Sequence, residues 1–190
     1  MPDAGRVIAG TARGLRLEAP GPGTRPIGDR VKQTLFAILE PTLAGARVLD
    51  LYAGSGAAGI EALSRGAAGA VFVERDARAI LVITANLART RLAGPTVHVT
   101  RADALVWLAS AAAAKAGPFD LAVVDPPYDD PALLVRSLEL LGPLFAPGAR
   151  VVAKHFWRDS PPSVVGLLAS ERERRFGETA LTFYRRQEAR

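Results

Sequence analysis

The chain has 190 residues, 49% of them hydrophobic and 23% charged, with no cysteine and a formal net charge of +5. This composition suits one ordinary globular unit, and the lack of thiols excludes a disulfide framework, a cysteine-ligated metal site and a cysteine nucleophile. No apolar stretch resembles a signal peptide or approaches the roughly 20 residues of a membrane span. We therefore expect a cytoplasmic protein, monomeric and without membrane or metal partners.

Basic residues are concentrated near the N-terminus, where residues 1–32 carry three of the five net positive charges. Such an excess indicates a polyanionic partner, although a solvated surface in an arginine-rich protein would look the same. The candidate nucleic-acid contacts are Arg6, Arg13, Arg16, Arg25, Arg30 and Lys32.

The N-terminal segment predicts a β-hairpin with strands at residues 6–10 and 14–18. Asp29 suits a helix N-cap, and apolar residues then recur at helical spacing, at Val31, Leu35, Ile38 and Leu39. An amphipathic helix over this stretch would leave Arg30, Lys32 and Gln33 on the solvent face.

From Pro41 onwards, short apolar strands alternate with helical stretches. Strands are predicted at 46–52, 70–74, 96–100, 119–124 and 149–155, and helices at 57–66, 76–91, 103–115 and 130–142. This alternation predicts an α/β, Rossmann-like unit with a mostly parallel sheet and helices on both faces. Residues 167–174 and 180–185, around Gly177, predict a C-terminal antiparallel hairpin. We expect an N-terminal extension over residues 1–40 and a core over residues 41–190.

The first strand of the alternating unit leads into a glycine-rich loop. Gly54, Gly56 and Gly59 satisfy G-x-G-x-x-G, and Glu74 follows Gly54 by twenty residues. This pattern permits a nicotinamide dinucleotide and hence an NAD(P)-dependent oxidoreductase. Against that reading, Asp50 precedes the loop and would repel a diphosphate, and the chain has no evident hydride-transfer residues.

S-adenosylmethionine suits these strand ends better. The Asp50 carboxylate can meet the ammonium of its methionyl group, Glu74 can accept its ribose hydroxyls, and Asp103 can meet its adenine amine. Asp103 and Glu74 are also plain helix-cap candidates. The remaining residues that we expect along the cofactor are Tyr52, Ala53, Gly54, Ser55, Gly56, Arg75 and Ala104.

The motif Asp125-Pro126-Pro127-Tyr128 follows a buried apolar strand. The carboxylate of Asp125 and a backbone carbonyl can accept hydrogen bonds from an exocyclic amine, and the ring of Tyr128 can stack on a base. The two prolines stiffen the turn, because proline fixes φ and has no N–H. The same four residues could also form an ordinary turn after a strand.

Two segments of the chain, Leu49–Ala57 and Gly59–Ala67, resemble the RsmD family of bacterial small-subunit rRNA guanine-N2 methyltransferases. Further similar segments are Arg6–Gly10 with Arg13-Gly14, Arg25-Pro26 with Asp29–Lys32, and Asp125–Tyr128. The resemblance covers roughly residues 6–155. The chain departs from the family pattern at Ile27, Gln33 and Ala58, and at Lys154-His155, where the family is often acidic.

This resemblance implies methyl transfer from S-adenosylmethionine to the N2 amine of a guanine in 16S rRNA, free or within the 30S subunit. It implies that Asp125 and the carbonyl of Pro126 hold the amine, that Pro127 stiffens the turn and that Tyr128 stacks on the base. Other readings are a DNA amino-methyltransferase acting on adenine N6 or cytosine N4, and a non-catalytic RNA-binding assembly factor. Roles for Lys154, His155, Phe156 and Trp157 stay open, and His98 is expected to be structural.

Overall fold

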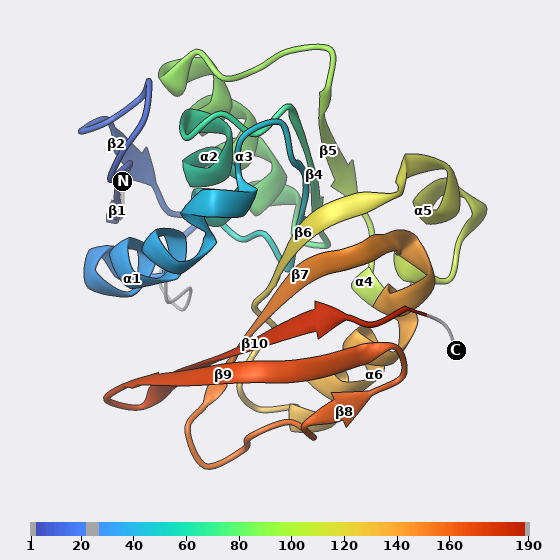
Figure 1. Cartoon of the computed structure of the whole chain (residues 1–190). Helices are drawn as coiled ribbons and strands as arrows, with labels where there is room; N and C mark the ends of the chain where they lie inside the picture. Colours follow the sequence, from blue (N-terminus) through green and yellow to red (C-terminus); the bar gives the residue numbers. More distant parts are fainter. Residues whose placement is uncertain (1–2, 22–26, 189–190) are drawn as a thin grey trace.

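A central sheet of eight strands organises the structure, a computed structural model that describes residues 3–21 and 27–188. Its strands are β3 (Arg47–Leu51), β4 (Gly69–Glu74), β5 (Val97–Arg101), β6 (Phe119–Val124), β7 (Phe145–Phe156), β8 (Val164–Val165), β9 (Leu168–Phe176) and β10 (Thr179–Arg186). They are arranged in the order β5-β4-β3-β6-β7-β10-β9-β8 (Figure 1). Strands β3 to β7 pair in parallel, and β10, β9 and β8 pair antiparallel. The expected mostly parallel sheet with an antiparallel C-terminal hairpin is confirmed.

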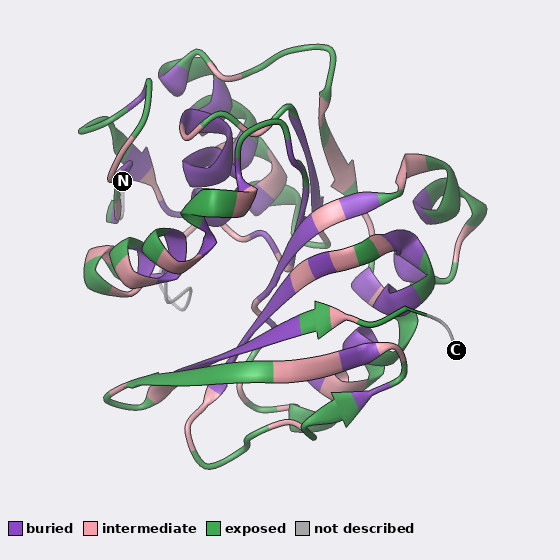
Figure 2. Cartoon of the chain, in the orientation of Figure 1, coloured by how far each residue is buried: buried purple, intermediate pink, exposed green. Residues whose placement is uncertain are grey.

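Helices cover both faces of this sheet (Figure 1). They are α1 (Asp29–Leu39), α2 (Ala57–Ser64), α3 (Ala77–Thr90), α4 (Ala104–Leu108), α5 (Ala111–Ala116) and α6 (Pro131–Leu141), with 3-10 turns at Glu40–Thr42 and Gly142–Leu144. Buried side chains of α1, α2 and α3 belong to one hydrophobic cluster, and those of α4, α5 and α6 to another. Figure 2 shows the central strands buried between these helices. None of the helices in the described ranges is long and apolar enough to span a bilayer.

The stretch predicted as one helix over residues 103–115 forms two helices, so that prediction is wrong. Ser110 interrupts it with extended backbone between α4 and α5. Its Oγ accepts a hydrogen bond from the N–H of Ala113 and donates one to the carbonyl of Trp107. Serine competes with the helix backbone in this way, which is why it caps α5 rather than continuing α4.

The N-terminal hairpin, made of β1 (Asp3–Arg6) and β2 (Arg16–Glu18), is shorter than the sequence predicts. Residues 7–10 are not in a strand: Val7 still forms backbone hydrogen bonds with Leu15 and Gly14 across the hairpin, but the next two residues donate elsewhere. The N–H groups of Ile8 and Ala9 donate to the carboxylate of Glu61 on α2, at 2.7 and 3.1 Å. The loop between β1 and β2 is thereby held against the core.

A second anchor of this segment is Asn86, a fully buried side chain on α3. Its Nδ2 donates to the carbonyls of Glu18, at 2.9 Å, and Ser55, at 3.0 Å, while its Oδ1 accepts from the N–H of Glu18 at 2.9 Å. One amide group thus joins β2, α3 and the glycine-rich loop.

Helix α1 begins at Asp29, but its N-cap is Gly28 without a side-chain cap, so the prediction that Asp29 is the N-cap is wrong. The Asp29 carboxylate pairs with Arg6 and Lys32 instead. Lys32 also does not lie on the solvent face of the helix. The Lys32 side chain is fully buried, and its Nζ donates to the carbonyl of Arg6 at 2.6 Å and lies 3.5 Å from Asp29 Oδ1. Burial lowers the pKa of Lys32, and the nearby carboxylates of Asp29 and Glu61 oppose that shift. Lys32 therefore fixes α1 to β1, and in this conformation it cannot contact a phosphate.

Glu61 offers a direct test of the N-terminal anchor. We expect Glu61→Ala to lower the free energy of unfolding by about 3 kcal/mol, because it leaves two backbone N–H groups and the Nε–H of Arg65 without their acceptor. Glu61→Gln, which keeps one acceptor oxygen, should cost less. Urea denaturation gives the values, and Glu139→Ala on the exposed side of α6 serves as the control. A loss below about 0.5 kcal/mol for Glu61→Ala would contradict the anchor.

Candidate active site

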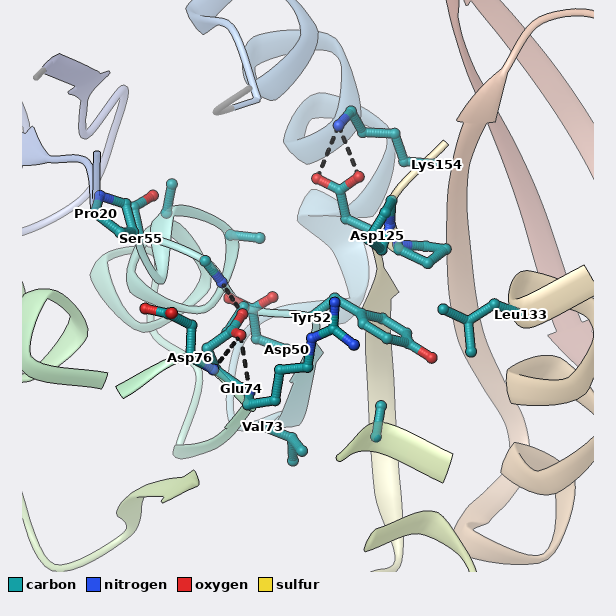
Figure 3. A pocket seen from close by; sticks show the side chains of 18 of the residues that line it. Pro20, Asp50, Tyr52, Ser55, Val73, Glu74, Asp76, Asp125, Leu133 and Lys154 are labelled. Carbon is teal, nitrogen blue, oxygen red and sulfur yellow. Dashed lines mark hydrogen bonds and ion pairs between the residues drawn. The ribbon is translucent and has the colours of Figure 1, made fainter. Parts of the chain in front are cut away.

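The site lies where the strand order of the sheet reverses direction. From β3 the chain moves outward to β4 and β5, and it then returns to place β6 on the other side of β3. Ligands of open α/β sheets bind outside the carboxyl ends of the strands at such a switch point. A pocket of about 720 Å³ opens there, hereafter the site pocket, and residues that follow β3, β4 and β6 line it (Figure 3).

The charge of this pocket is strongly asymmetric. Among the described residues that line it, six are acidic and two are basic. The acidic ones are Asp50, Glu74, Asp76, Asp103, Asp125 and Asp129, and the basic ones are Arg75 and Lys154. A pocket with this lining favours a ligand that carries positive charge.

The loop after β3 begins with a strained residue. Tyr52 has a positive φ of 63°, which is uncommon outside glycine, and its hydroxyl is hydrogen-bonded to Ser137 Oγ of α6 at 2.8 Å. The N–H groups of Tyr52 and Ala53 both donate to the carbonyl of Val73 on β4. Gly54 follows with φ 54°, and a Cβ there would have only the carbonyl of Tyr52 near it, at 4.0 Å. The added atom would therefore face the site pocket.

Gly56 is not brought to the pocket, although the sequence suggested it. A Cβ at Gly56 would lie 3.2 to 3.3 Å from Ile83 and 3.3 Å from Phe72, so this glycine is required by packing of the loop on the core. All the other residues expected along the cofactor line the pocket. They are Asp50, Tyr52, Ala53, Gly54, Ser55, Glu74, Arg75, Asp103 and Ala104.

Asp50 is buried within β3, and its Oδ2 accepts a hydrogen bond from the N–H of Gly59 at 2.8 Å. Burial raises the pKa of Asp50 to about 8, the amide of Gly59 opposes the shift, and the charges of Asp125 and Glu74 add to it. The carboxyl group is consequently protonated for the most part at pH 7. A cation placed against it would favour its ionised form.

Glu74 ends β4 and organises the loops around it. Its Oε2 accepts from the N–H of Gly54 at 2.9 Å, and its Oε1 accepts from the N–H groups of Arg75 and Asp76 at 2.8 and 2.9 Å. Asp103 caps α4 by accepting from the N–H of Val106 at 3.1 Å. The cap role foreseen for Asp103 is therefore present, whereas the one foreseen for Glu74 is wrong, because Asp76 caps α3 and Glu74 accepts from the loop before that helix. Both Glu74 and Asp103 also line the pocket.

The predicted catalytic motif borders the same pocket. Asp125 follows β6, and Pro126, Pro127 and Tyr128 also line the cavity. The hydroxyl of Tyr128 is hydrogen-bonded to Thr179 Oγ1 of β10 at 3.0 Å. This hydrogen bond to β10 therefore helps to fix the position of the Tyr128 ring.

Lys154 on β7 is a pocket residue to which the sequence assigned no role. Its Nζ lies 2.7 and 2.8 Å from the two carboxylate oxygens of Asp125, as Figure 3 shows, and 5.0 Å from the ring centroid of Tyr128. The signal that could have found it is the strand register. Val124 pairs with Ala153, so the next residue of each strand lies at the same edge of the sheet.

The other candidate residues lie elsewhere. Arg6, Arg13, Arg16 and Arg30 are exposed on the N-terminal segment, and Arg25 lies outside the described residues. Arg6 forms an ion pair with Asp29, and Arg16 forms one with Asp3.

Neither histidine reaches the pocket. His155 is buried between Phe156 O and Thr182 Oγ1, at 2.8 and 2.9 Å, whereas His98 is exposed on β5. Phe156 lies 6.4 Å from Tyr128 and 6.2 Å from Trp157 between ring centroids, so a row of rings extends away from the motif. Within the described ranges, no group of three or more potential ligand side chains could hold a metal ion.

Comparison with known proteins identifies the family. A family profile described as "Conserved hypothetical protein 95" matches residues 5–185. The chain belongs to this family. It is 37% identical over 185 residues to "Ribosomal RNA small subunit methyltransferase D" of Escherichia coli strain K12, covering 96% of this chain and 90% of the relative. It is 38% identical over 187 residues to a Bacillus subtilis protein provisionally named rRNA methyltransferase YlbH, covering 96% and 99%.

A solved structure agrees with this assignment. The Escherichia coli protein yhhF, provisionally named a methyltransferase, superposes with a TM-score of 0.82 and 35% identity over 97% of this chain and 98% of that one. The predicted fold class and the resemblance to the RsmD family are both confirmed.

The raised pKa of Asp50 predicts how stability depends on pH. Its folded-state pKa of about 8 lies above the ordinary 3.8, so the folded state binds more protons between these values. The contribution of this raised pKa to the free energy of unfolding is fully present below pH 3.8 and is lost as the pH rises through 8. The wild type should therefore lose at least about 1 kcal/mol relative to Asp50→Asn between pH 5 and pH 8. Urea denaturation at both pH values measures this, and a pH-independent difference would contradict the assignment.

Proposed function

We propose that this chain transfers a methyl group from S-adenosylmethionine to the exocyclic N2 amine of a guanine in small-subunit rRNA. The observation that carries the proposal is that the acidic end of β3, with Asp50, and the Asp125–Tyr128 motif open into one pocket. A cofactor half and an amine-binding half are thus adjacent. The Escherichia coli relative, which the chain matches over 90% of its length, is named for methylation of small-subunit rRNA.

The residues present fit S-adenosylmethionine. This molecule carries an ammonium and a sulfonium, and the pocket has six acidic side chains against two basic ones. The missing Cβ of Gly54 leaves room for a ligand against the loop backbone. In this proposal Asp50 holds the ammonium, Glu74 the ribose hydroxyls, and Asp103 the adenine amine, with Arg75 and Ala104 beside the same end.

The remaining residues act on the nucleophile. S-adenosylmethionine, when bound, supplies a methyl group on a positively charged sulfur. The carboxylate of Asp125 and the carbonyl of Pro126 each accept a hydrogen from the guanine amine, which aims its lone pair at the methyl group. Asp125 also stabilises the positive charge that develops on the amine. Tyr128 stacks on the base once it leaves its helix or loop. The methylated cation is acidic, so no strong general base is needed.

The competing functions account less well for this pocket. A nicotinamide dinucleotide would place its diphosphate in a pocket where acidic side chains outnumber basic ones by six to two, and ionised carboxylates repel it. An amine of adenine or cytosine in DNA could use Asp125 and Tyr128 in the same manner. Only the nucleic acid that becomes methylated distinguishes this alternative, so the experiment below includes DNA.

We further propose that residues 1–40 form the RNA-facing extension. Arg6, Arg13, Arg16 and Arg30 are exposed along it, and Arg25 belongs to the same basic set. Their charges would hold phosphates beside the target base and would position the RNA without reading its sequence. Two extension residues, Pro20 and Ile27, also line the site pocket, which supports a continuous path from this segment to the catalytic motif.

The double variant Arg13→Ala, Arg16→Ala should weaken RNA binding and leave cofactor affinity unchanged. Each lost phosphate contact reduces the slope of log K against log salt by about 0.7 to 0.9, so we expect a reduction of up to about 1.8. Fluorescence anisotropy over a salt series measures the slope, and calorimetry measures cofactor binding. Lys115→Ala on α5 controls for loss of surface charge. Equal loss of RNA and cofactor binding would indicate a structural role for these arginines instead.

The reaction is tested by incubating the protein with methyl-labelled S-adenosylmethionine and small subunits that lack the modification. After RNA digestion, mass spectrometry should find the label in N2-methylguanosine. Asp125→Ala should reduce the rate by about 100-fold to 1000-fold, since it removes a group aimed at the developing charge. Glu139→Ala serves as the control. Label in an adenine or cytosine amine of added DNA would overturn the substrate, and no label in either would overturn the reaction.

A further inference from the structure

The catalytic carboxylate is not free in this structure, because an ammonium group is bonded to it. Lys154 Nζ lies 2.7 Å from Oδ1 and 2.8 Å from Oδ2 of Asp125. The two side chains are only 8% and 18% exposed. Hydrogen bonds between charged groups are strong, and water competes weakly for a pair so well covered.

The strand register brings these two residues together. Strands β6 and β7 are parallel, with Val123 opposite Val152 and Val124 opposite Ala153. Asp125 and Lys154 are the next residues of the two strands. Because the residues before them are paired, Asp125 and Lys154 lie at the same edge of the sheet. Both line the site pocket.

The groups around Asp125 come from neighbouring strands and from its own loop. Asp50 on β3 is a buried acid, and the charges of Asp125 and of Glu74 on β4 both raise its pKa. Tyr128 presents its ring to the Lys154 ammonium at 5.0 Å. Burial raises the pKa of Asp125, and Lys154 opposes this shift. Lys154 is thus the cation that favours the ionised form of Asp125 beside a second buried acid.

We propose that Lys154 is a positioning residue for methyl transfer, which holds the Asp125 carboxylate in one orientation and yields one of its two oxygens to the incoming amine. This inference rests on the proposed function. An ionised Asp125 accepts the amine hydrogen, whereas a protonated Asp125 would present a donor to it. The bidentate contact also limits rotation of the carboxylate, so the oxygen that Lys154 releases is already aimed at the pocket.

The exchange gives the ammonium a second use. As the amine bonds to one oxygen, Lys154 stays bonded to the other, because both distances are short. The ammonium therefore favours the ionised form of Asp125 during binding, and this charge stabilises the positive charge that develops on the nucleophile. Lys154 touches neither cofactor nor amine in this scheme and acts only through Asp125.

The test compares Lys154→Met, which keeps the length of the side chain without its charge, with Lys154→Arg, which keeps the charge. Arg150→Met is the matched control, since Arg150 lies on the same strand and pairs with Glu171 rather than with a pocket residue. The first readout is kcat over a pH series at saturating cofactor and RNA, with cofactor Kd measured separately. The second is titration of the Asp125 carboxyl by NMR, which needs no substrate.

For Lys154→Met we expect kcat at pH 7 to fall at least tenfold while cofactor Kd changes less than threefold. Because Asp125 loses its cation, its titration and the acid limb of the pH profile should move to higher pH, and part of the lost rate should return in alkali. Lys154→Arg should bring both the Asp125 titration and the acid limb of the kcat profile back toward the wild type. Arg150→Met should change neither of them.

An unchanged titration of Asp125 in Lys154→Met overturns the proposal, whether or not RNA is methylated. A reduced kcat with an unmoved acid limb, or an equal loss of kcat and cofactor affinity, also overturns it and indicates a structural role. A different conclusion follows if the wild type methylates no nucleic acid but the titration of Asp125 still moves in Lys154→Met. In that case the proposed function fails, and the electrostatic link between Lys154 and Asp125 stands.

Discussion

Carboxylates that lie close together in a poorly solvated pocket repel one another, and the site of this protein depends on how that repulsion is compensated. Three strands deliver an acid to one edge of the sheet, and each acid has a different partner. Asp50 accepts a hydrogen bond from the amide of Gly59, and its pKa is raised to about 8. Glu74 has three loop amides, and Asp125 has an ammonium. The geometry of the loops follows from these needs, because the amides that satisfy Glu74 belong to the chain segments that shape the pocket.

The N-terminal segment depends on the same core that supports the pocket. Glu61 fixes the loop between β1 and β2, and Asn86 joins β2 to the carbonyl of Ser55 in the glycine-rich loop. Pro20 and Ile27 then reach the pocket wall itself. A surface for RNA on this extension would accordingly be held at a set distance from the Asp125–Tyr128 motif, since buried hydrogen bonds fix the described part of the extension to the core.

Motifs at strand ends could be predicted because their positions depend on local rules. Apolar runs locate the strands, and parallel strands bring their carboxyl ends to one edge, so Asp50, Glu74 and Asp125 were found from the sequence. What failed depends on partners distant in the chain. Lys32 follows the spacing of an exposed residue, yet a carbonyl 26 residues earlier accepts its hydrogen bond. Lys154 requires the register of β6 against β7, which a single sequence does not specify.

The insertion of β10 between β7 and β9 has a consequence for synthesis of the chain. The ribosome makes β7, with Lys154, well before Thr179–Arg186, which form its second neighbour in the sheet. Thr179 also carries the hydroxyl that bonds Tyr128. Until β10 has emerged, β7 is an open edge and the aromatic ring of the motif lacks its support. A nascent chain can therefore form the Asp50 end of the pocket first and completes the Asp125–Tyr128 side only with the last strand in chain order.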